Sequence, residues 1–63
     1  MKADKKKLEL IMARKCMNTG DLLTVAKMPR PTFNKVLRGE NVSTRTIGLV
    51  AEALKVDVTE IIE

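Results

Sequence analysis

The chain has 63 residues, enough for one small domain that buries only about 60% of the surface its unfolded form would expose. It contains one cysteine and no histidine, so neither an internal disulfide nor a zinc site can support the fold. The formal net charge of +4 is unevenly divided: residues 1–45 carry 11 basic and 4 acidic side chains (+7), whereas residues 46–63 carry 1 and 4 (−3). This asymmetry predicts a positive field on one part of the molecule, which suits a polyanionic partner but also occurs on ordinary solvated surfaces.

No apolar run typical of a signal peptide follows the basic residues near Met1, and no segment is long enough to span a membrane. Together with the free thiol of Cys16, these features predict a cytoplasmic protein. Histidine and tyrosine are absent, and no paired carboxylates share a face of an expected helix, so catalysis has few residues to use. We therefore expect no enzyme, no cofactor and no metal.

The periodicity of the chain is helical throughout, which predicts an all-α fold. The first amphipathic helix is expected over about 4–17, where Leu8, Ile11 and Met12 fall at the spacing of a single apolar stripe. Asp4 stands where it can cap the start of this helix.

A second, short helix is expected over about 19–26. Asn18 is a preferred N-cap residue, and Asp21 three positions later can complete a capping box. Leu22, Leu23 and Ala26 give this helix an inward side, and Met28 after it is expected to fill the core. The helix must end before Pro29, because a residue that precedes proline is pushed out of the α region.

A third helix is expected over about 31–38. Arg30 precedes a proline and should be extended, which leaves Pro31 at the first helical position, where its missing N–H costs nothing. Gly39 is expected to end this helix in the left-handed conformation.

Two further helices are expected over about 44–54 and 58–62. Ser43 is the N-cap expected for the first, and Asp57 with Glu60 repeats the capping-box spacing for the second. The helices together predict one apolar core: Leu8, Ile11, Met12, Leu22, Phe33, Val36, Leu37, Ile47, Val50, Ala51, Leu54 and Val56.

The third helix has two contrasting faces at helical spacing. One face carries Phe33, Val36 and Leu37, and the opposite face carries polar and basic residues. Arginine and lysine donate to guanine O6 and N7, and asparagine can pair with adenine, so an exposed helix of this kind suits the DNA major groove. An ordinary solvated surface would explain the same polar face equally well.

The chain from about Leu8 to Glu63 resembles the Cro/repressor-type helix-turn-helix family, also called the xenobiotic-response-element family. The residues that carry the resemblance are Met17, Asn18 and Leu22, then Thr32 to Gly39, Thr46 and Ile47, Val50 to Val56, and Asp57 to Ile62. The resemblance implies a compact five-helix, lambda-repressor-like domain with the helix-turn-helix at helices 2 and 3. It also implies sequence-specific binding of double-stranded DNA as a homodimer, and transcriptional regulation as a repressor.

Position by position, the resemblance assigns two groups of DNA contacts. Residues at positions that face bases are Arg30, Pro31, Thr32, Asn34 and Lys35. Residues at positions that contact the phosphate backbone are Asn18, Thr19, Arg38, Asn41, Thr44 and Arg45. For Asn18 a role as a cap alone is the alternative, and for Thr44 a structural role at the helix start is equally open.

Some residues depart from the family pattern. Lys27 occupies the turn position where glycine is usual, and Leu23 stands where a small alanine usually lies between the two helices. Pro31 cannot donate a hydrogen bond from the reading face. Gly48 lowers the helix propensity of its segment unless it permits a close helix approach.

An alternative function is a protein-interaction module, such as an antitoxin-like or anti-repressor partner. Leu10 lies off the apolar stripe of the first helix, and either Ile61 or Ile62 is left outside the core, so these residues would supply its contacts. Cys16 is either a redox-sensing thiol or a small packing residue. The lysines at 5–7 form either an arm that touches DNA or a solvated helix start. No segment is left over for a ligand domain, so no small-molecule effector is expected.

Overall fold

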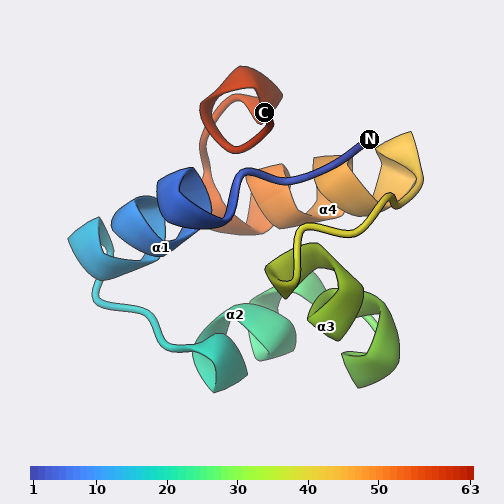
Figure 1. The fold of residues 1–63 in the computed structure, drawn as a ribbon. Coiled ribbons are helices and arrows are strands. Elements are labelled where there is room, and N and C mark those ends of the chain that lie inside the picture. Colours follow the sequence, from blue (N-terminus) through green and yellow to red (C-terminus); the bar gives the residue numbers. More distant parts are fainter.

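The computed structural model describes all 63 residues as four α-helices and one 3-10 turn around a single core (Figure 1). The elements in chain order are α1 (Lys5–Arg14), α2 (Thr19–Ala26), α3 (Arg30–Leu37), α4 (Thr44–Leu54) and the 3-10 helix η1 (Val58–Glu60). The all-helical fold is confirmed, but the fifth helix expected over 58–62 is only a single 3-10 turn. None of the helices is both long and apolar enough to cross a bilayer.

Fourteen apolar residues form the buried core. Most of the expected core residues are among them, but Leu37 and Val56 are only half-buried and pack against its edge. The core also includes Ala26, Met28 and Ile61, which agree with the inward side of the second helix, a core-filling methionine and one C-terminal isoleucine in the core. Ala3 is the one core residue that the sequence did not predict. Phe33, the only aromatic residue, is completely buried and is the largest side chain in the core. Helix α3 is therefore fixed to the rest of the domain through Phe33.

Side-chain caps begin every helical element except α3. Asp4 accepts a hydrogen bond from the Lys7 amide at the start of α1, and Asn18 and Asp57 each form a complete capping box. Ser43 caps α4 by accepting from an amide in its first turn. At α3 the N-cap residue is a proline and no side-chain cap is present. The capping pattern of the sequence thus predicts where most elements begin.

Helix α1 ends at Arg14, earlier than the expected end at Met17. Cys16 adopts a left-handed conformation (φ 54°), and the Met17 amide donates to the Met12 carbonyl over 2.9 Å. This pattern is a Schellman-type helix end, which closes the last turn and turns the chain away from the helix axis. Cys16 is exposed there, so its interpretation as a packing residue is wrong.

Helix α3 begins one residue before the expected start. Pro29 is the extended N-cap (φ −60°, ψ 140°), and its carbonyl accepts from the Phe33 amide over 3.1 Å. Arg30 is therefore helical rather than extended, and Pro31 lies in the second helical position. This hydrogen bond is the first i→i−4 bond of α3, and the complete burial of Phe33 anchors the same turn, so the helix outweighs the local preference of a residue before proline.

The turn between α2 and α3 contains the expected departure from glycine. Lys27 is left-handed (φ 52°, ψ 47°) and its amide donates to the Leu23 carbonyl over 3.1 Å. A non-glycine residue in this conformation costs about 1 kcal/mol or more. Gly39, as expected, takes a positive φ (72°) after α3.

Residues 1–3 lie extended between two distant parts of the chain, a feature that the sequence did not predict. Antiparallel bridges join Lys2 to Asn41 and Ala3 to Ile62. Figure 1 shows this segment running beside α4 toward the loop that follows α3. The N-terminal segment therefore connects that loop with the C-terminal residues.

Candidate nucleic-acid interface

The exposed face of α3 holds the residues expected to read bases. Arg30, Pro31 and Lys35 are exposed, and Thr32 and Asn34 are half-buried. The inner face of the same helix consists of side chains with no exposed surface, namely Phe33 and Val36. The structure thus holds α3 firmly from behind and leaves one side of it open for contact.

The first turn of α3 has amide groups without partners. Pro31 has no N–H, and the amides of Arg30 and Thr32 donate to no acceptor within the chain. Free amides at a helix start, together with the helix dipole, favour anions and hydrogen-bond acceptors. This end of α3 therefore suits the oxygen and nitrogen acceptors of a nucleic acid.

At the start of α2, Asn18 is fully used as a cap on its oxygen side. Its Oδ1 accepts from the Asp21 amide over 2.8 Å, and an Asp21 carboxylate oxygen accepts from the Asn18 amide over 3.1 Å. Only the Asn18 NH₂ group remains for an outside acceptor. Thr19 is half-buried at the first helical position. At this helix start, the Asn18 NH₂ group, the Thr19 hydroxyl and the free amides of the first turn are the groups that could contact a DNA phosphate.

The loop after α3 combines charge pairing with free donors. Arg38 Nε donates to the Glu40 carboxylate, and both side chains are largely exposed (60% and 47%). Asn41 Oδ1 accepts from the Met1 amino group over 2.6 Å. The Arg38–Glu40 pair engages the Nε side of the guanidinium and leaves its other N–H groups available to another acceptor.

At the start of α4, capping is done by Ser43 and not by Thr44. Ser43 Oγ accepts from the Thr46 amide over 3.2 Å, whereas the exposed Thr44 hydroxyl makes no hydrogen bond within the chain. Arg45 is also exposed and forms no ion pair. Thr44 is therefore not the cap of α4, and the side chains of Thr44 and Arg45 are both open to an outside partner.

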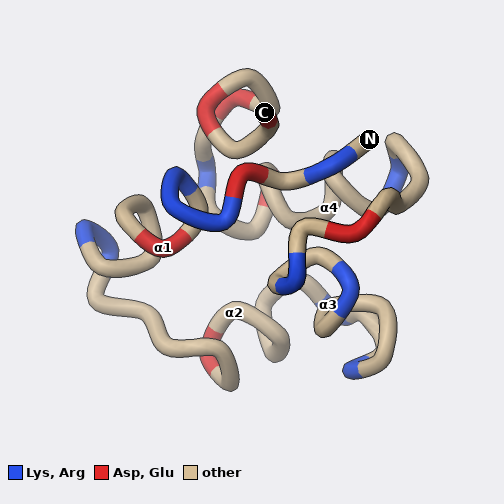
Figure 2. The backbone as a smooth tube through the Cα atoms, in the orientation of Figure 1, with Lys and Arg blue, Asp and Glu red and all other residues tan.

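Basic residues outnumber acidic ones over most of the molecule, whereas acidic residues gather at the last turn. Figure 2 shows Lys and Arg on the N-terminal segment, α1, α3 and the start of α4, and acidic residues around the last turn and also on α1, α2 and the loop after α3. The chain contains a single ion pair, Arg38–Glu40, so the remaining basic side chains are not neutralised by close acidic partners. The positive field predicted for one part of the molecule therefore has a structural basis.

One of the three lysines at 5–7 lies beside two of the expected phosphate-contacting residues, a placement that the sequence did not predict. Lys5 lines a hollow of about 290 Å³ together with Thr19 and Arg38, at the junction of α1, α2 and α3. The available signal was helical spacing, since Lys5 shares a face of α1 with Glu9 and Met12. The lysines at 5–7 begin α1 and do not form an arm.

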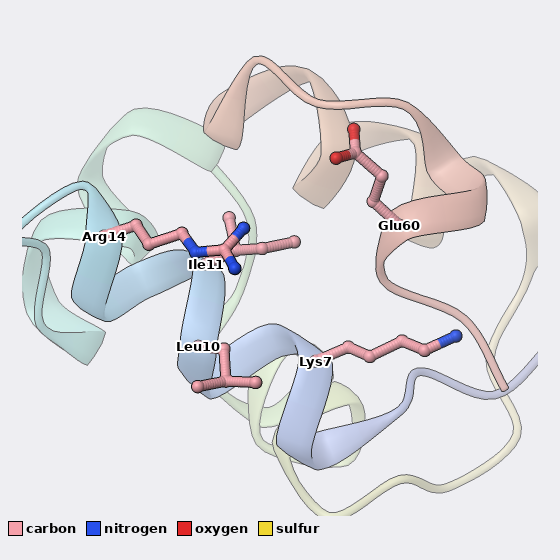
Figure 3. Close-up of a pocket in the computed structure, with 5 residues that line it drawn as sticks. All are labelled: Lys7, Leu10, Ile11, Arg14 and Glu60. Carbon is pink, nitrogen blue, oxygen red and sulfur yellow. The ribbon is translucent and has the colours of Figure 1, made fainter.

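A second hollow lies away from α3, between α1 and η1 (Figure 3). It has a volume of about 240 Å³, and its lining includes Leu10 (59% exposed), Arg14 and Glu60. Lys7, on the same side, donates its ammonium to the Ile62 carbonyl over 3.2 Å. Nowhere in the chain do three histidine, cysteine or acidic side chains gather as a metal site would need. This hollow carries no arrangement typical of catalysis.

Comparison with known proteins agrees with this geometry. The model of a family described as a Cro/C1-type helix-turn-helix DNA-binding domain matches residues 7–63. No curated protein matches the chain, and no solved structure does. The family is described by DNA binding, and its match spans nearly the whole sequence, including all four α-helices from the third residue of α1 onward. The chain belongs to the Cro/C1-type helix-turn-helix DNA-binding family.

Proposed function

We propose that the 63 residues act as a single helix-turn-helix domain in the cytoplasm, where the domain binds double-stranded DNA sequence-specifically and represses transcription. The observation that carries the proposal is the exposed face of α3, with Arg30 and Lys35 opposite the completely buried Phe33. Membership of a DNA-binding family supports it. Repression requires only that the domain occupy its site, which needs no surface beyond those described above.

In this proposal α3 lies in the major groove and contacts base edges through Arg30, Pro31, Thr32, Asn34 and Lys35. Arginine and lysine donate to guanine, and asparagine can pair with adenine. Pro31 contributes shape or contact with a thymine methyl group, because it has no donor. The free amides of the first turn add contacts to phosphate or base acceptors.

Phosphates are held around the edges of α3. The proposed contacts are Asn18, Thr19, Arg38, Asn41, Thr44 and Arg45. The exposed, unpaired Arg45 at the start of α4 is the clearest of them, because its charge is free and the helix dipole there also favours an anion. These contacts fix the register of the domain on DNA without reading its sequence.

A homodimer is also part of the proposal. Helix α3 has eight residues, about 12 Å of axial length, and reaches only a few base pairs. Dimers of this motif contact more base pairs, because they bind two half-sites about 34 Å apart. The C-terminal turn is the proposed contact, because its Glu60 faces the exposed Leu10 and the oppositely charged Arg14 of α1 across the hollow of Figure 3. This set can pair with its copy across a two-fold axis.

The test distinguishes residues that contact base edges from residues that contact the phosphate backbone of DNA. Sites are first selected from randomised duplexes, and then Lys35→Ala, Arg30→Ala and Arg45→Ala are titrated against preferred and random duplexes at two salt concentrations. Lys35→Ala and Arg30→Ala should each cost about 1–3 kcal/mol on the preferred site and relax one base position. Arg45→Ala should weaken both duplexes alike and reduce the salt slope by about one per subunit.

Two outcomes contradict the proposal. If Arg45→Ala changes base preference while the two α3 variants do not, α3 does not lie in the groove. If the wild-type chain shows no salt-dependent DNA binding, the protein-interaction alternative is favoured, with Leu10 as its apolar contact. For the dimer, about five phosphate contacts per subunit give a slope of log affinity against log salt near −9, compared with about −4.5 for a monomer.

A further inference from the structure

We propose that the N-terminal segment is part of the DNA-binding surface and that Lys2 is a phosphate-contacting residue beside Asn41. The inference rests on the proposed function, and it adds a residue from a part of the chain that neither the resemblance nor the family match, which begins at residue 7, covers. Its basis is the unexpected pairing of Met1 and Lys2 with the loop that follows α3.

The pairing places Lys2 directly opposite Asn41 in an antiparallel bridge. The Val42 amide donates to the Met1 carbonyl over 2.7 Å, which fixes the register of the two segments. Residues directly opposite one another in an antiparallel pair project to the same side, with Cβ atoms about 4.5–5.5 Å apart. The Lys2 side chain therefore emerges beside Asn41, one of the proposed phosphate contacts.

The alternation of burial along the segment shows that Lys2 faces outward and Ala3 faces the core. Ala3 is only 1% exposed and lies in the core, whereas Lys2 is exposed. Successive residues of an extended chain point to opposite sides, so a buried Ala3 requires an outward Lys2. The partner segment alternates in the same way, with Asn41 exposed and Val42 half-buried.

The segment is held from both sides and is already ordered. The Asp4 amide donates to the Ile61 carbonyl over 2.7 Å, and the Glu63 amide donates to the Lys2 carbonyl over 3.3 Å. Ile61 itself is completely buried. A charge mounted on a fixed backbone loses less conformational entropy on binding than one on a free arm.

The chemistry that Lys2 and Asn41 present is all donor. No ion pair engages Lys2, so its ammonium is available. Asn41 Oδ1 already accepts a hydrogen bond from Met1, which leaves the NH₂ group for an outside acceptor. Acidic Glu40 nearby is paired with Arg38. Lys2 and Asn41 therefore offer neighbouring donors to a phosphate oxygen. Glu63, whose amide donates to the Lys2 carbonyl, is the acidic residue on the other side of Lys2 and forms no ion pair with it.

The experiment compares Lys2→Ala with Lys55→Ala, each of which removes one exposed lysine. Lys55 follows the C-terminal end of α4, at the opposite end of that helix from Arg45, and serves as the control. Binding to random and preferred duplexes is measured over a range of salt concentrations. Lys2→Ala should weaken both duplexes by the same factor, about eightfold per subunit at 0.1 M salt, and should reduce the salt slope by about 0.9 per subunit. Lys2→Arg should restore both values, and Lys55→Ala should change neither.

The outcomes are distinguishable. If Lys2→Ala keeps the wild-type slope while Arg45→Ala lowers it, the inference is overturned and the proposed function survives. If neither variant lowers the slope, the proposed function fails as well. A loss in Lys2→Ala that Lys2→Arg does not restore, or that is accompanied by a lower melting temperature, would assign Lys2 a structural role and also overturn the inference.

Discussion

Helices α3 and α4 share an amphipathic pattern but are constructed differently. Helix α4 has 11 residues, begins with the Ser43 cap and buries four side chains. Helix α3 has eight residues, begins at an uncapped proline and buries only Phe33 and Val36. Most of the stabilising features of a helix are thus concentrated in α4, whereas α3 depends on a few buried contacts to hold it in place.

The difference shows how a small domain separates stability from recognition. The start of α3 retains free amides and the outward Arg30 and Lys35, which raise the energy of the isolated helix but leave donors for a partner. The left-handed Lys27 and the missing side-chain cap are local departures from good helix design at the start of this helix. Such departures are expected where function and stability compete.

The largest effect is expected from removing the anchor of α3. Phe33 is completely buried, so Phe33→Ala should cost about 3–5 kcal/mol. A domain of this length has a total stability of about 3–9 kcal/mol, so the variant should be partly or fully unfolded at room temperature. Urea or thermal denaturation followed by circular dichroism measures the loss.

Leu54→Ala in α4 sharpens the comparison, because Leu54 is also completely buried and should cost about 2–5 kcal/mol. The exposed Lys35 on α3 supplies a surface control, for which alanine should change stability by less than about 0.5 kcal/mol. An unchanged cooperative melt of Phe33→Ala would show that α3 is held by other contacts.

The turn before α3 is the next point of contrast. Lys27 is left-handed without being glycine, so Lys27→Gly should stabilise the fold by about 1 kcal/mol. Lys55, left-handed at the end of α4 (φ 56°), is the matched position, and Lys55→Gly should gain a similar amount. The comparison is made by melting temperature. A gain at Lys55 without one at Lys27 would mean that the Lys27 side chain makes a compensating contact in the turn.

Glycine inside α4 is expected to have a smaller effect of the same sign. A Cβ added at Gly48 would meet no atom within 4 Å, so the glycine does not serve a close helix approach. Gly48→Ala should therefore stabilise the protein by about 0.5–1 kcal/mol through helix propensity. Gly39→Ala, at a positive φ of 72°, is the opposite control and should destabilise by about 1 kcal/mol. If Gly48→Ala and Gly39→Ala changed stability in the same direction, these roles of the two glycines would be wrong.

The smallest effect concerns the acidic cap of η1. The Thr59 hydroxyl and amide both donate to Asp57, and these hydrogen bonds lower the pKa of its carboxyl below the ordinary value of 3.8. A pKa lowered by folding adds stability above the unfolded pKa, and this stability is lost as pH falls through the folded value. The stability difference between wild type and Asp57→Asn should therefore be constant near neutral pH and shrink below about pH 4. If the stability difference between wild type and Asp57→Asn grew in acid, folding would raise the pKa of Asp57 instead of lowering it.

The sequence by itself determined the features that depend on neighbouring residues. Asp4, Asn18, Ser43 and Asp57 were identifiable as caps because a cap acts on amides two or three positions away. The buried stripe of α4 followed from helical spacing in the same way. The polar face of α3 was also visible in the sequence, although its contacts with DNA stay a prediction.

Only the tertiary structure decided the features that join distant parts of the chain. The burial of Ala3 and the pairing of Lys2 with Asn41 depend on an extended segment meeting a loop about 40 residues away, for which the sequence carries no local signal. The start of α3 at Arg30 likewise reflects the position of Phe33 in the core, which outweighed the local preference before Pro31. Short-range hydrogen bonds are encoded by spacing, whereas packing assigns a residue its place only after the helices have come together.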